Sequence, residues 1–494
     1  MQALVRTILD PKRLFLGILL LGIFTLAARN ITDPDFWWHL RTGQYIVETH
    51  SIPHTDPFSF TRAGYSWIAH EWLSELLIYS VYRAAGWGGL IVVFAGLTSA
   101  TFSLLYLRCA GRPYVAGVLV LWAAFACRPT WGVRPHTISF LFASLLLWIL
   151  EPPRDQRALW WIVPLTFLWA NLHAGYSLGI ALLVLFLVGG WLDGVFGFTS
   201  STEIPTHTRS LALTIVLSLA VVVLNPSGWR LYGYPFTTLH SAAMQNHIAE
   251  WFSPNFHQAE YAPLLAMLLA TLVLPALTTV RIRPRTVLLV CVSAYAALQS
   301  VRFVPIFALI ATPLLAEHAE AWTQSQRWNQ RTSYSSRLTW PKLAFHSAVA
   351  VILVVFTCVQ VRQVVQRQAV SEAIEFPAAA AAADFLRERR ALGPLFNDYN
   401  WGGYLIWKLY PGTRVFMDGR ADLYGDEFME QFSATYNLTG DWQRALDRWQ
   451  IATVIVPSKS PLATALPASG VWKPLFHDPQ VVVLARIGTP RARN

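Results

Sequence analysis

Charged residues are scarce in this chain of 494 residues: Asp, Glu, Lys and Arg make up only 13%, whereas hydrophobic residues make up 54%. A soluble protein usually carries about 25% charged residues, so the composition excludes an ordinary soluble domain and indicates a polytopic membrane protein. Acidic residues are the scarcer sign, 28 against 38 basic ones. In a membrane protein this excess fits positive cytoplasmic loops better than a nucleic-acid partner.

Cysteine is also rare. The four cysteines do not have the spacing of a metal site, and a disulfide framework is not expected. They are Cys109, Cys127, Cys291 and Cys358. No small-residue cleavage site follows the first apolar segment, 14–28, so this segment is expected to remain as a membrane helix with a cytoplasmic N-terminus.

Long apolar runs, by contrast, recur through the first three quarters of the chain and predict an α-helical polytopic protein with about eleven transmembrane helices. The runs lie at about 13–29, 88–107, 114–127, 136–150, 157–170, 174–194, 208–224, 261–279, 284–299, 302–316 and 343–361. The run 66–84 is predicted to be an amphipathic helix in the membrane interface, because its polar and apolar side chains occupy opposite faces. With this assignment most Lys and Arg fall in the inner loops, as the positive-inside rule expects.

The topology divides the chain into a transmembrane domain, 1–361, with a long first outer loop, 30–87, and an extracytoplasmic domain, 362–494. Alternating helical and strand-like patterns predict a small α/β fold for the second domain. Helices are expected at 377–390, 426–435 and 440–449, and strands at 414–417, 451–456 and 481–485.

The stretch from Asp33 to Gly43 places two acids, a His and an Arg directly after the first span. Ionisable groups are costly near hydrocarbon, so such a cluster is a functional-site hypothesis. Asp35 or Asp33 could act as a general base on an acceptor, or hold a divalent cation. The alternative is structural, with Asp33 as a helix N-cap and Pro34 at the first helical position. His39 and the neighbouring Trp pair are expected to be scaffold and interface anchor.

Two further acidic motifs follow in the same loop. Asp56 precedes Pro57 and is expected to cap a turn. Glu71 is a candidate second carboxylate for a substrate or, with Asp35, for Mg²⁺ or Mn²⁺, and His70 is a candidate substrate contact; a solvated polar face is the alternative for both. Because His70 and Glu71 are adjacent, they do not form the His-Glu-x-x-His pair of a zinc protease.

Other outer loops carry further candidates. Arg134 and Arg302 are suited to bidentate binding of a lipid phosphate, and headgroup anchoring is the alternative. His173 is a candidate substrate contact or a buried polar partner between spans. In the C-terminal domain, Asp398 and Tyr399 stand beside a Gly pair that permits close backbone approach, although a plain loop and helix would explain the same residues.

The first outer loop, with Asp33-Pro34-Asp35 after the first span and interfacial helices behind it, resembles the GT-C class of membrane glycosyltransferases. The order of its motifs is similar to that of oligosaccharyltransferase catalytic subunits. The segment from Asn397 to Tyr404, followed by 414–418, looks like a loose counterpart of their Trp-Trp-Asp-Tyr-Gly motif, without the double Trp. Trp-Trp-His-x-x-x-Gly, Asp-Pro-Phe-Ser and His-Glu-Trp-Leu also look like motifs of GT-C-like bacterial membrane proteins.

The resemblance implies an inverting transfer of a sugar from a polyprenyl-phosphate donor to an extracytoplasmic glycan, lipid or protein, in the bacterial inner membrane. Asp35 or Asp33 would be the base, a divalent ion would lie between that acid and Glu71, and Arg302 or Arg134 would stabilise the leaving phosphate. Two other functions stay open: a transporter or flippase of a lipid-linked glycan, and a non-catalytic assembly subunit. The clustering of polar motifs on one side of the membrane disfavours the transporter.

Overall fold

The computed structural model describes residues 11–109, 113–151, 156–198, 204–326, 340–370, 376–389 and 393–487. The chain forms two compact units, each built from three separate stretches. We call the first the helical unit; it comprises Met1–Arg29, Ile91–Leu224 and Ala249–Val364. We call the second the mixed unit; it comprises Asn30–Leu90, Asn225–Ile248 and Val365–Asn494.

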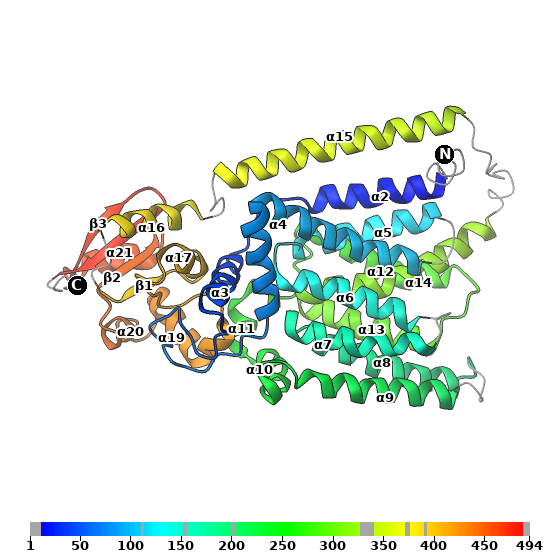
Figure 1. Ribbon diagram of the computed structural model, residues 1–494, viewed down its shortest axis with the longest axis horizontal. Coiled ribbons are helices and arrows are strands. Elements are labelled where there is room, and N and C mark those ends of the chain that lie inside the picture. Colours follow the sequence, from blue (N-terminus) through cyan, green and yellow to red (C-terminus); the bar gives the residue numbers. More distant parts are fainter. Residues whose placement is uncertain are drawn as a thin grey trace. The chain divides into compact units, whose positions relative to one another are not determined.

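A helix lies at every apolar run that the sequence analysis identified (Figure 1). These helices are α2 (Pro11–Ala27), α4 (Trp72–Arg108), α5 (Pro113–Cys127), α6 (Pro135–Leu150), α7 (Ile162–Leu172), α8 (Tyr176–Val195), α9 (Ile204–Val222), α12 (Ala262–Ala276), α13 (Pro284–Gln299), α14 (Val304–Ser325) and α15 (Trp340–Val370). Among the described residues, six helices are long and apolar enough to cross a membrane, and four apolar helices are shorter. The protein is therefore a helical membrane protein by composition and helix length.

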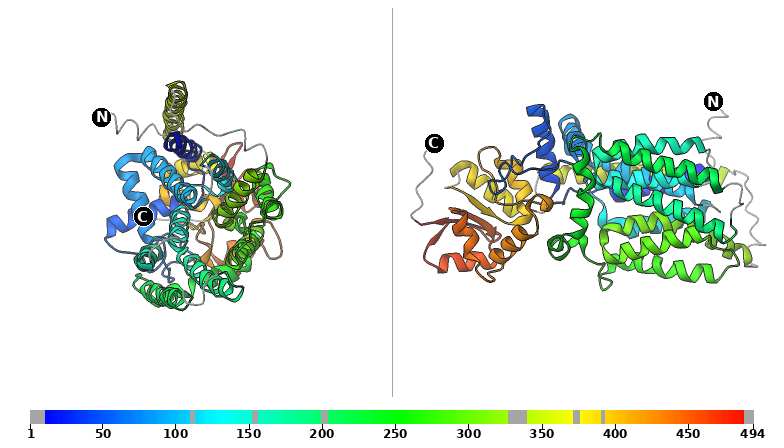
Figure 2. Two further views of the ribbon diagram at one scale, coloured as in Figure 1. Left: turned by 90° about the vertical axis from the view of Figure 1, so that its right-hand side faces the viewer. Right: turned by 90° about the horizontal axis from the view of Figure 1, so that it is seen from below.

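Helix α14 forms the centre of the helical unit. It packs against α5, α6, α12 and α13. Helix α8 in turn packs against both α13 and α9. Seen end on, these helices run side by side (Figure 2, left). Most residues of α14 are buried, including Phe307, Leu309 and Leu315, so apolar packing holds this helix in place.

A helix is present where the interfacial helix was predicted, but it is shorter than expected. It begins at Trp72 and not at residue 66, so His70 and Glu71 lie in the loop before it. At Gly86 the backbone has φ 58° and ψ −154°, a conformation that interrupts the helix and that side-chain-bearing residues rarely adopt. The amphipathic part of α4 is thereby separated from the apolar part that follows, as the sequence pattern predicted.

The mixed unit contains a four-stranded sheet with the order β1-β2-β4-β3. Its strands are β1 (Leu395–Asn397), β2 (Thr453–Pro457), β3 (Trp472–His477) and β4 (Val481–Arg486). β1 and β2 are parallel, and the other pairs are antiparallel. Its helices are α3 (Phe36–Thr49), α10 (Tyr234–His240), α11 (Ala242–His247), α16 (Pro377–Arg389), α17 (Gly402–Leu409), α18 (Ala421–Tyr424), α19 (Asp426–Tyr436), α20 (Gln443–Arg448) and α21 (Pro461–Ala468).

Several C-terminal predictions are confirmed. The helices at 377–390, 426–435 and 440–449 correspond to α16, α19 and α20, with Arg390 outside the described residues, and two strands correspond to β2 and β4. The strand predicted at 414–417 is wrong. Residues Val415, Phe416 and Met417 are buried, but among the described residues this segment forms a backbone bridge only at Val415, with Ser59 of the first loop. A run of buried residues therefore produced a strand pattern without a strand.

Close glycine contacts fix α3 within the mixed unit. A Cβ atom on Gly43 would overlap the carbonyl oxygen of Glu75 in α4, and one on Gly403 would lie 2.7 Å from the carbonyl oxygen of Pro34. Trp37 and Trp38 are 1% and 6% exposed, so they form part of the core. The expectation that this Trp pair anchors the chain in the interface is wrong, whereas its role as scaffold is confirmed.

Candidate functional site

A fully buried arginine, Arg420, organises the centre of the mixed unit. Its Nε and Nη2 atoms each donate a hydrogen bond of 2.7 Å to Asp418, and Nη1 lies 2.8 Å from Asp56. The guanidinium also lies 4.6 Å from the ring centre of Trp67. Burial alone would lower the pKa of Arg420, but the two carboxylates hold it well above the ordinary value. The arginine stays charged and joins the first loop to the loop that begins at residue 418.

The Asp56 turn prediction is confirmed, and the ion pair is an addition that the sequence did not reveal. Asp56 accepts hydrogen bonds from the backbone N–H of Phe58 and of Ser59, each at 3.0 Å. These are the bonds of a capped turn. The same carboxylate then neutralises Arg420, which comes from a segment more than 350 residues later in the chain.

A group of buried acids and histidines lies next to this arginine. His39 Nδ1 lies 3.3 Å from Glu71 and 3.4 Å from Glu75, and His70 Nε2 lies 3.0 Å from Glu71. Glu75 is 1% exposed, and its Oε2 atom has no hydrogen-bond partner among the residues that the structure describes. We call His39, His70, Glu71 and Glu75 the acid–histidine cluster. Its members are buried, so the solvated polar face considered for His70 and Glu71 is excluded.

His70 connects this cluster to two further elements. Its ring lies 4.1 Å from that of Tyr234 in α10, and its Nδ1 atom lies 3.2 Å from the carbonyl oxygen of Ile68. Burial alone would lower the pKa of His70, but the carboxylates of Glu71 and Asp422 outweigh it, and the pKa is raised. Burial raises the pKa of Asp422, opposed by His70. The folded protein therefore holds the proton of His70 to a higher pH than a free imidazole does.

Asp35 lies against the loop that carries Arg420. A Cβ atom built on Gly419 would overlap Oδ1 of Asp35 and would lie 3.2 Å from Nε1 of Trp38. Only a glycine leaves room for this carboxylate. His39 follows one turn later in α3, so Asp35 and this member of the acid–histidine cluster share a face of the helix.

Asp33 has a different role from Asp35. Its Oδ1 accepts a hydrogen bond of 2.8 Å from the backbone N–H of Asp35 and so shapes the turn before α3. The N-cap residue is Asp35, although its side chain makes no capping hydrogen bond. The prediction that Asp33 is the N-cap and Pro34 the first helical residue is therefore wrong by two positions, because the helix begins at Phe36.

Tyr399 approaches the same glycine as Asp35: its hydroxyl donates a hydrogen bond of 3.4 Å to the carbonyl oxygen of Gly419. Asp398 faces elsewhere. It accepts hydrogen bonds from the backbone N–H of Asn400 and from the hydroxyl of Tyr436 at 2.5 Å, and it caps a short 3₁₀ helix. Burial raises the pKa of Asp398, opposed by these hydrogen bonds. Of this predicted pair, Tyr399 is the residue that reaches the Asp35 region.

In the helical unit, Arg134 and Arg302 meet at one acid, Glu250. Arg134 forms an ion pair with Glu250, and the guanidinium of Arg302 lies 5.0 Å from the ring centre of Trp251. Burial alone would raise the pKa of Glu250, but Arg134 and Arg302 together lower it. Two guanidinium groups against one carboxylate leave a net positive charge, which suits an anion.

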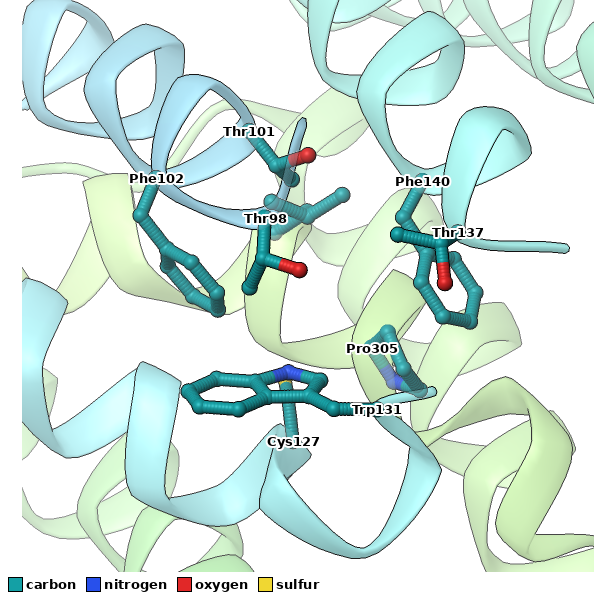
Figure 3. Close-up of a pocket in the computed structure, with 9 residues that line it drawn as sticks. Thr98, Thr101, Phe102, Cys127, Trp131, Thr137, Phe140 and Pro305 are labelled. Carbon is teal, nitrogen blue, oxygen red and sulfur yellow. The ribbon is translucent and has the colours of Figure 1, made fainter. Parts of the chain in front are cut away.

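The helical unit contains a pocket. Two of its lining residues, Thr137 and Pro305, each follow one of these arginines by about one helical turn. Thr137 comes three residues after Arg134, and Pro305 three residues after Arg302. The pocket is lined by Thr98, Thr101, Phe102, Cys127, Trp131, Thr137, Phe140, Pro305 and Leu309. Figure 3 shows Phe102 and Phe140 on opposite sides, with the indole of Trp131 across the pocket.

The pocket is apolar in character because its hydroxyl groups are already bonded. Thr98 and Thr101 donate to backbone carbonyl oxygens of their own helix, and Thr137 donates to Gly132. What remains for a ligand is carbon surface. His173 also lies in the helical unit, where its Nδ1 atom is 2.7 Å from the hydroxyl oxygen of Ser139. Its interpretation as a buried polar partner is confirmed.

Among the residues that the structure describes, no group of three or more His, Cys, Asp and Glu side chains could hold a metal ion. Glu71, one of the two predicted ligands, is occupied by two histidines, and Asp35 packs against Gly419. The donor set therefore does not fit a divalent cation in this arrangement.

The structure brings together, within the mixed unit, Asp35, Tyr399, His70 and Glu71 around the loop 418–422. Sequence reasoning missed Glu75, Arg420 and Asp422 as members of this region. A signal for Glu75 was present in the sequence. It lies four residues after Glu71, which places both side chains on one face of the helix predicted at 66–84. Arg420 offered no such signal, because its partners come from the distant first loop.

No protein-family model matches the chain, and no curated protein matches its sequence. Among solved structures it is similar to the oligosaccharyltransferase AglB from Archaeoglobus fulgidus in complex with an inhibitory peptide and a dolichol-phosphate, with a TM-score of 0.58 and 10% identity, over 91% of this chain and 70% of that chain. It is also similar to the apo form of the Archaeoglobus fulgidus oligosaccharyltransferase, with a TM-score of 0.55 and 12% identity, over 89% and 69%.

ArnT from Cupriavidus metallidurans in the apo state gives a TM-score of 0.51 and 13% identity over 96% of this chain and 97% of that chain. These neighbours are GT-C glycosyltransferases, so the resemblance drawn from the first loop is confirmed at the level of the fold. The chain has a GT-C-like fold with a small C-terminal sheet. At this identity the likeness establishes the fold and leaves the activity to the site.

Proposed function

We propose that this protein is a membrane glycosyltransferase that transfers a sugar from a polyprenyl-phosphate-linked donor to an extracytoplasmic acceptor. The observation that carries the proposal is the half-buried carboxylate of Asp35, held against Gly419 in a GT-C-like fold.

In the proposed reaction, the acceptor hydroxyl or amide attacks the anomeric carbon of the donor sugar. The bond between that carbon and the phosphate oxygen breaks, the configuration inverts, and the phosphate leaves with the bonding electron pair. Asp35 takes the proton of the acceptor and later releases it to solvent. Asp33 positions Asp35 through the hydrogen bond to its backbone N–H.

Arg302 and Arg134 are the proposed phosphate-binding residues, and the leaving phosphate is the group whose charge increases in the transition state. The net positive charge of the arrangement around Glu250 supports this role. His173, bonded to Ser139, is a supporting residue in the same unit.

Glu71 and His70 are proposed to contact the acceptor side of the substrate, because Glu71 pairs with His39, which follows Asp35 by one turn in α3, and His70 is close to Asp422 in the loop that follows Gly419. Tyr399 is proposed to complete this side from the C-terminal segment, and Asp398 to support it by capping the 3₁₀ helix that begins at Tyr399. We further propose an inner-membrane location, with about eleven spans in residues 1–361 and an extracytoplasmic domain at 362–494, as the distribution of Lys and Arg suggests.

The proposal is tested by lipid and glycan profiling of a deletion strain complemented with wild-type protein or with Asp35→Asn. The deletion and the Asp35→Asn strain should both accumulate one sugar-linked polyprenyl phosphate and lose one glycan. Wild-type protein should reverse both changes. If Asp35→Asn restores the glycan as well as the wild type does, the catalytic assignment is wrong.

A further inference from the structure

A short aromatic-rich segment of the mixed unit, residues 225–248, exposes its largest apolar side chains. It contains the 3₁₀ helix η3 (Gly228–Tyr232), α10 and α11. In the sequence it lies between two apolar helices, α9 and α12. We call residues 225–248 the aromatic segment.

The exposed apolar side chains of the aromatic segment are Trp229, Phe236 and Leu239, which are 76%, 65% and 46% exposed. Phe236 and Leu239 are three residues apart in α10 and therefore share one face. In the sequence the segment follows directly on Val223 and Leu224, two exposed apolar residues just after α9. Large exposed aromatic residues next to a membrane helix are typical of the lipid–water interface.

The other side of the segment is polar and is bound to the rest of the mixed unit. Arg230 donates a hydrogen bond of 2.7 Å to Ser66, and Ser241 donates one of 2.5 Å to Asp426. The ring of Tyr234 lies against that of His70, a member of the acid–histidine cluster. The segment is thus amphipathic, with one side committed to the protein around the candidate site.

The charge of the aromatic segment has one sign. Residues 225–248 include no Asp or Glu, and their ionisable side chains other than tyrosine are Arg230, His240 and His247. His247 pairs with Glu430 at 3.0 Å, and His240 is exposed. Arg230, the one permanently charged side chain of the segment, is exposed, so it is attracted to anionic lipid headgroups while the aromatic side chains are held by apolar burial.

We propose that the aromatic segment is a lipid-interface anchor, with Trp229, Phe236 and Leu239 inserted at the headgroup–acyl boundary of an anionic bilayer. Through Tyr234 and Ser241 the anchored segment holds the His70 side of the candidate site at the membrane surface. The position of the segment in the sequence, between the apolar helices α9 and α12, and its exposed aromatic side chains favour lipid as the occupant. The inference concerns where the segment lies, so it does not depend on the transfer reaction proposed above.

The test is site-directed spin labelling of full-length protein in nanodiscs of phosphatidylglycerol and phosphatidylethanolamine. The four native cysteines are replaced by serine or alanine, and single cysteines are placed by Trp229→Cys and Phe236→Cys. Leu272→Cys in α12, 72% exposed, gives the lipid reference, and Lys473→Cys in β3, an exposed residue of the sheet, gives the water reference. Collision of each label with oxygen and with a water-soluble nickel chelate reports its depth.

Labels at 229 and 236 should collide with oxygen several-fold more, relative to the nickel chelate, than the label at 473. Their depth should lie between the two references, and it should shift toward water when phosphatidylglycerol is omitted. The proposal is overturned if the labels at 229 and 236 behave as the one at 473. It is overturned equally if they are shielded from both reagents, which would mean that a protein partner covers this face. Each variant is compared with wild type for monodispersity, so a misfolded one is recognised and replaced by Leu239→Cys.

Discussion

The carboxylate of Asp35 lies against the Cα atom of Gly419, so closely that a single methyl group at residue 419 would overlap it. Residue 419 is adjacent to Arg420, whose guanidinium is held by Asp418 and Asp56. The position of the proposed base is therefore determined by a loop that is itself fixed by a buried charge. This relationship makes Gly419 a direct probe of Asp35.

Gly419→Ala should lower the transfer rate strongly while the protein stays folded, because the added methyl group displaces the carboxylate of Asp35 from its position. Gly412→Ala is the matched control, since its Cβ atom would have no neighbour closer than 3.4 Å. The rate of transfer and the thermal unfolding temperature are measured for both. Adding Gly419→Ala to Asp35→Asn should cause little further loss, because both changes act on one group. Additive losses would show that Gly419 acts elsewhere.

Arg420→Met should destabilise the protein by about 3–5 kcal/mol, because it leaves the carboxylates of Asp418 and Asp56 buried without a counter-charge. Arg387→Met is the control: Arg387 is exposed and pairs with Asp384 across one helical turn, so its loss should cost less than about 0.5 kcal/mol. Denaturant unfolding in mild detergent gives both values. Equal effects of the two substitutions would contradict the organising role of Arg420.

His70 predicts a pH dependence of stability. Its pKa is raised in the folded protein, so the stabilisation is fully present below the unfolded pKa of about 6.5 and is lost as pH rises through the folded pKa. The difference in free energy of unfolding between wild type and His70→Gln should therefore be larger at about pH 6 than at about pH 9. A difference that grows with pH would show that the histidine is held neutral.

Arg302→Gln should weaken the binding of polyprenyl phosphate about tenfold, as expected for the loss of one charge-assisted hydrogen bond. Glu250→Gln should strengthen it, because this substitution removes the carboxylate that offsets both arginines. Native mass spectrometry with the lipid added in detergent measures the two affinities. If both substitutions change the affinity in the same direction, the arginines do not bind the phosphate.

The elements of this fold were largely predictable from sequence, because helix formation in a membrane protein depends on local apolar runs. All the predicted apolar runs coincide with helices. The run 88–107 is separated from the preceding amphipathic part of α4 at Gly86, whose backbone is not helical. The segment 414–417 was misassigned because burial alone gives a strand-like pattern. β1 and β3 were missed since the first has three residues and the second is mostly exposed.

The site was only partly predictable, for a different reason. Asp35, Glu71 and His70 belong to one local stretch, and their unusual position after the first span was visible in the sequence. Arg420 meets Asp56 across more than 350 residues, and the role of Gly419 depends on where Asp35 lies. Such contacts follow from tertiary packing, which no local pattern encodes.

The most direct test of the proposed function uses membranes from a deletion strain, in which the sugar-linked polyprenyl phosphate should accumulate. Purified wild-type protein, Asp33→Asn and Asp35→Asn are added, and the release of free polyprenyl phosphate is followed by mass spectrometry. The wild type should release it, Asp33→Asn should retain part of the rate, and Asp35→Asn should be at least about 100-fold slower. Release by Asp35→Asn at the wild-type rate would contradict the assignment of Asp35 as the base.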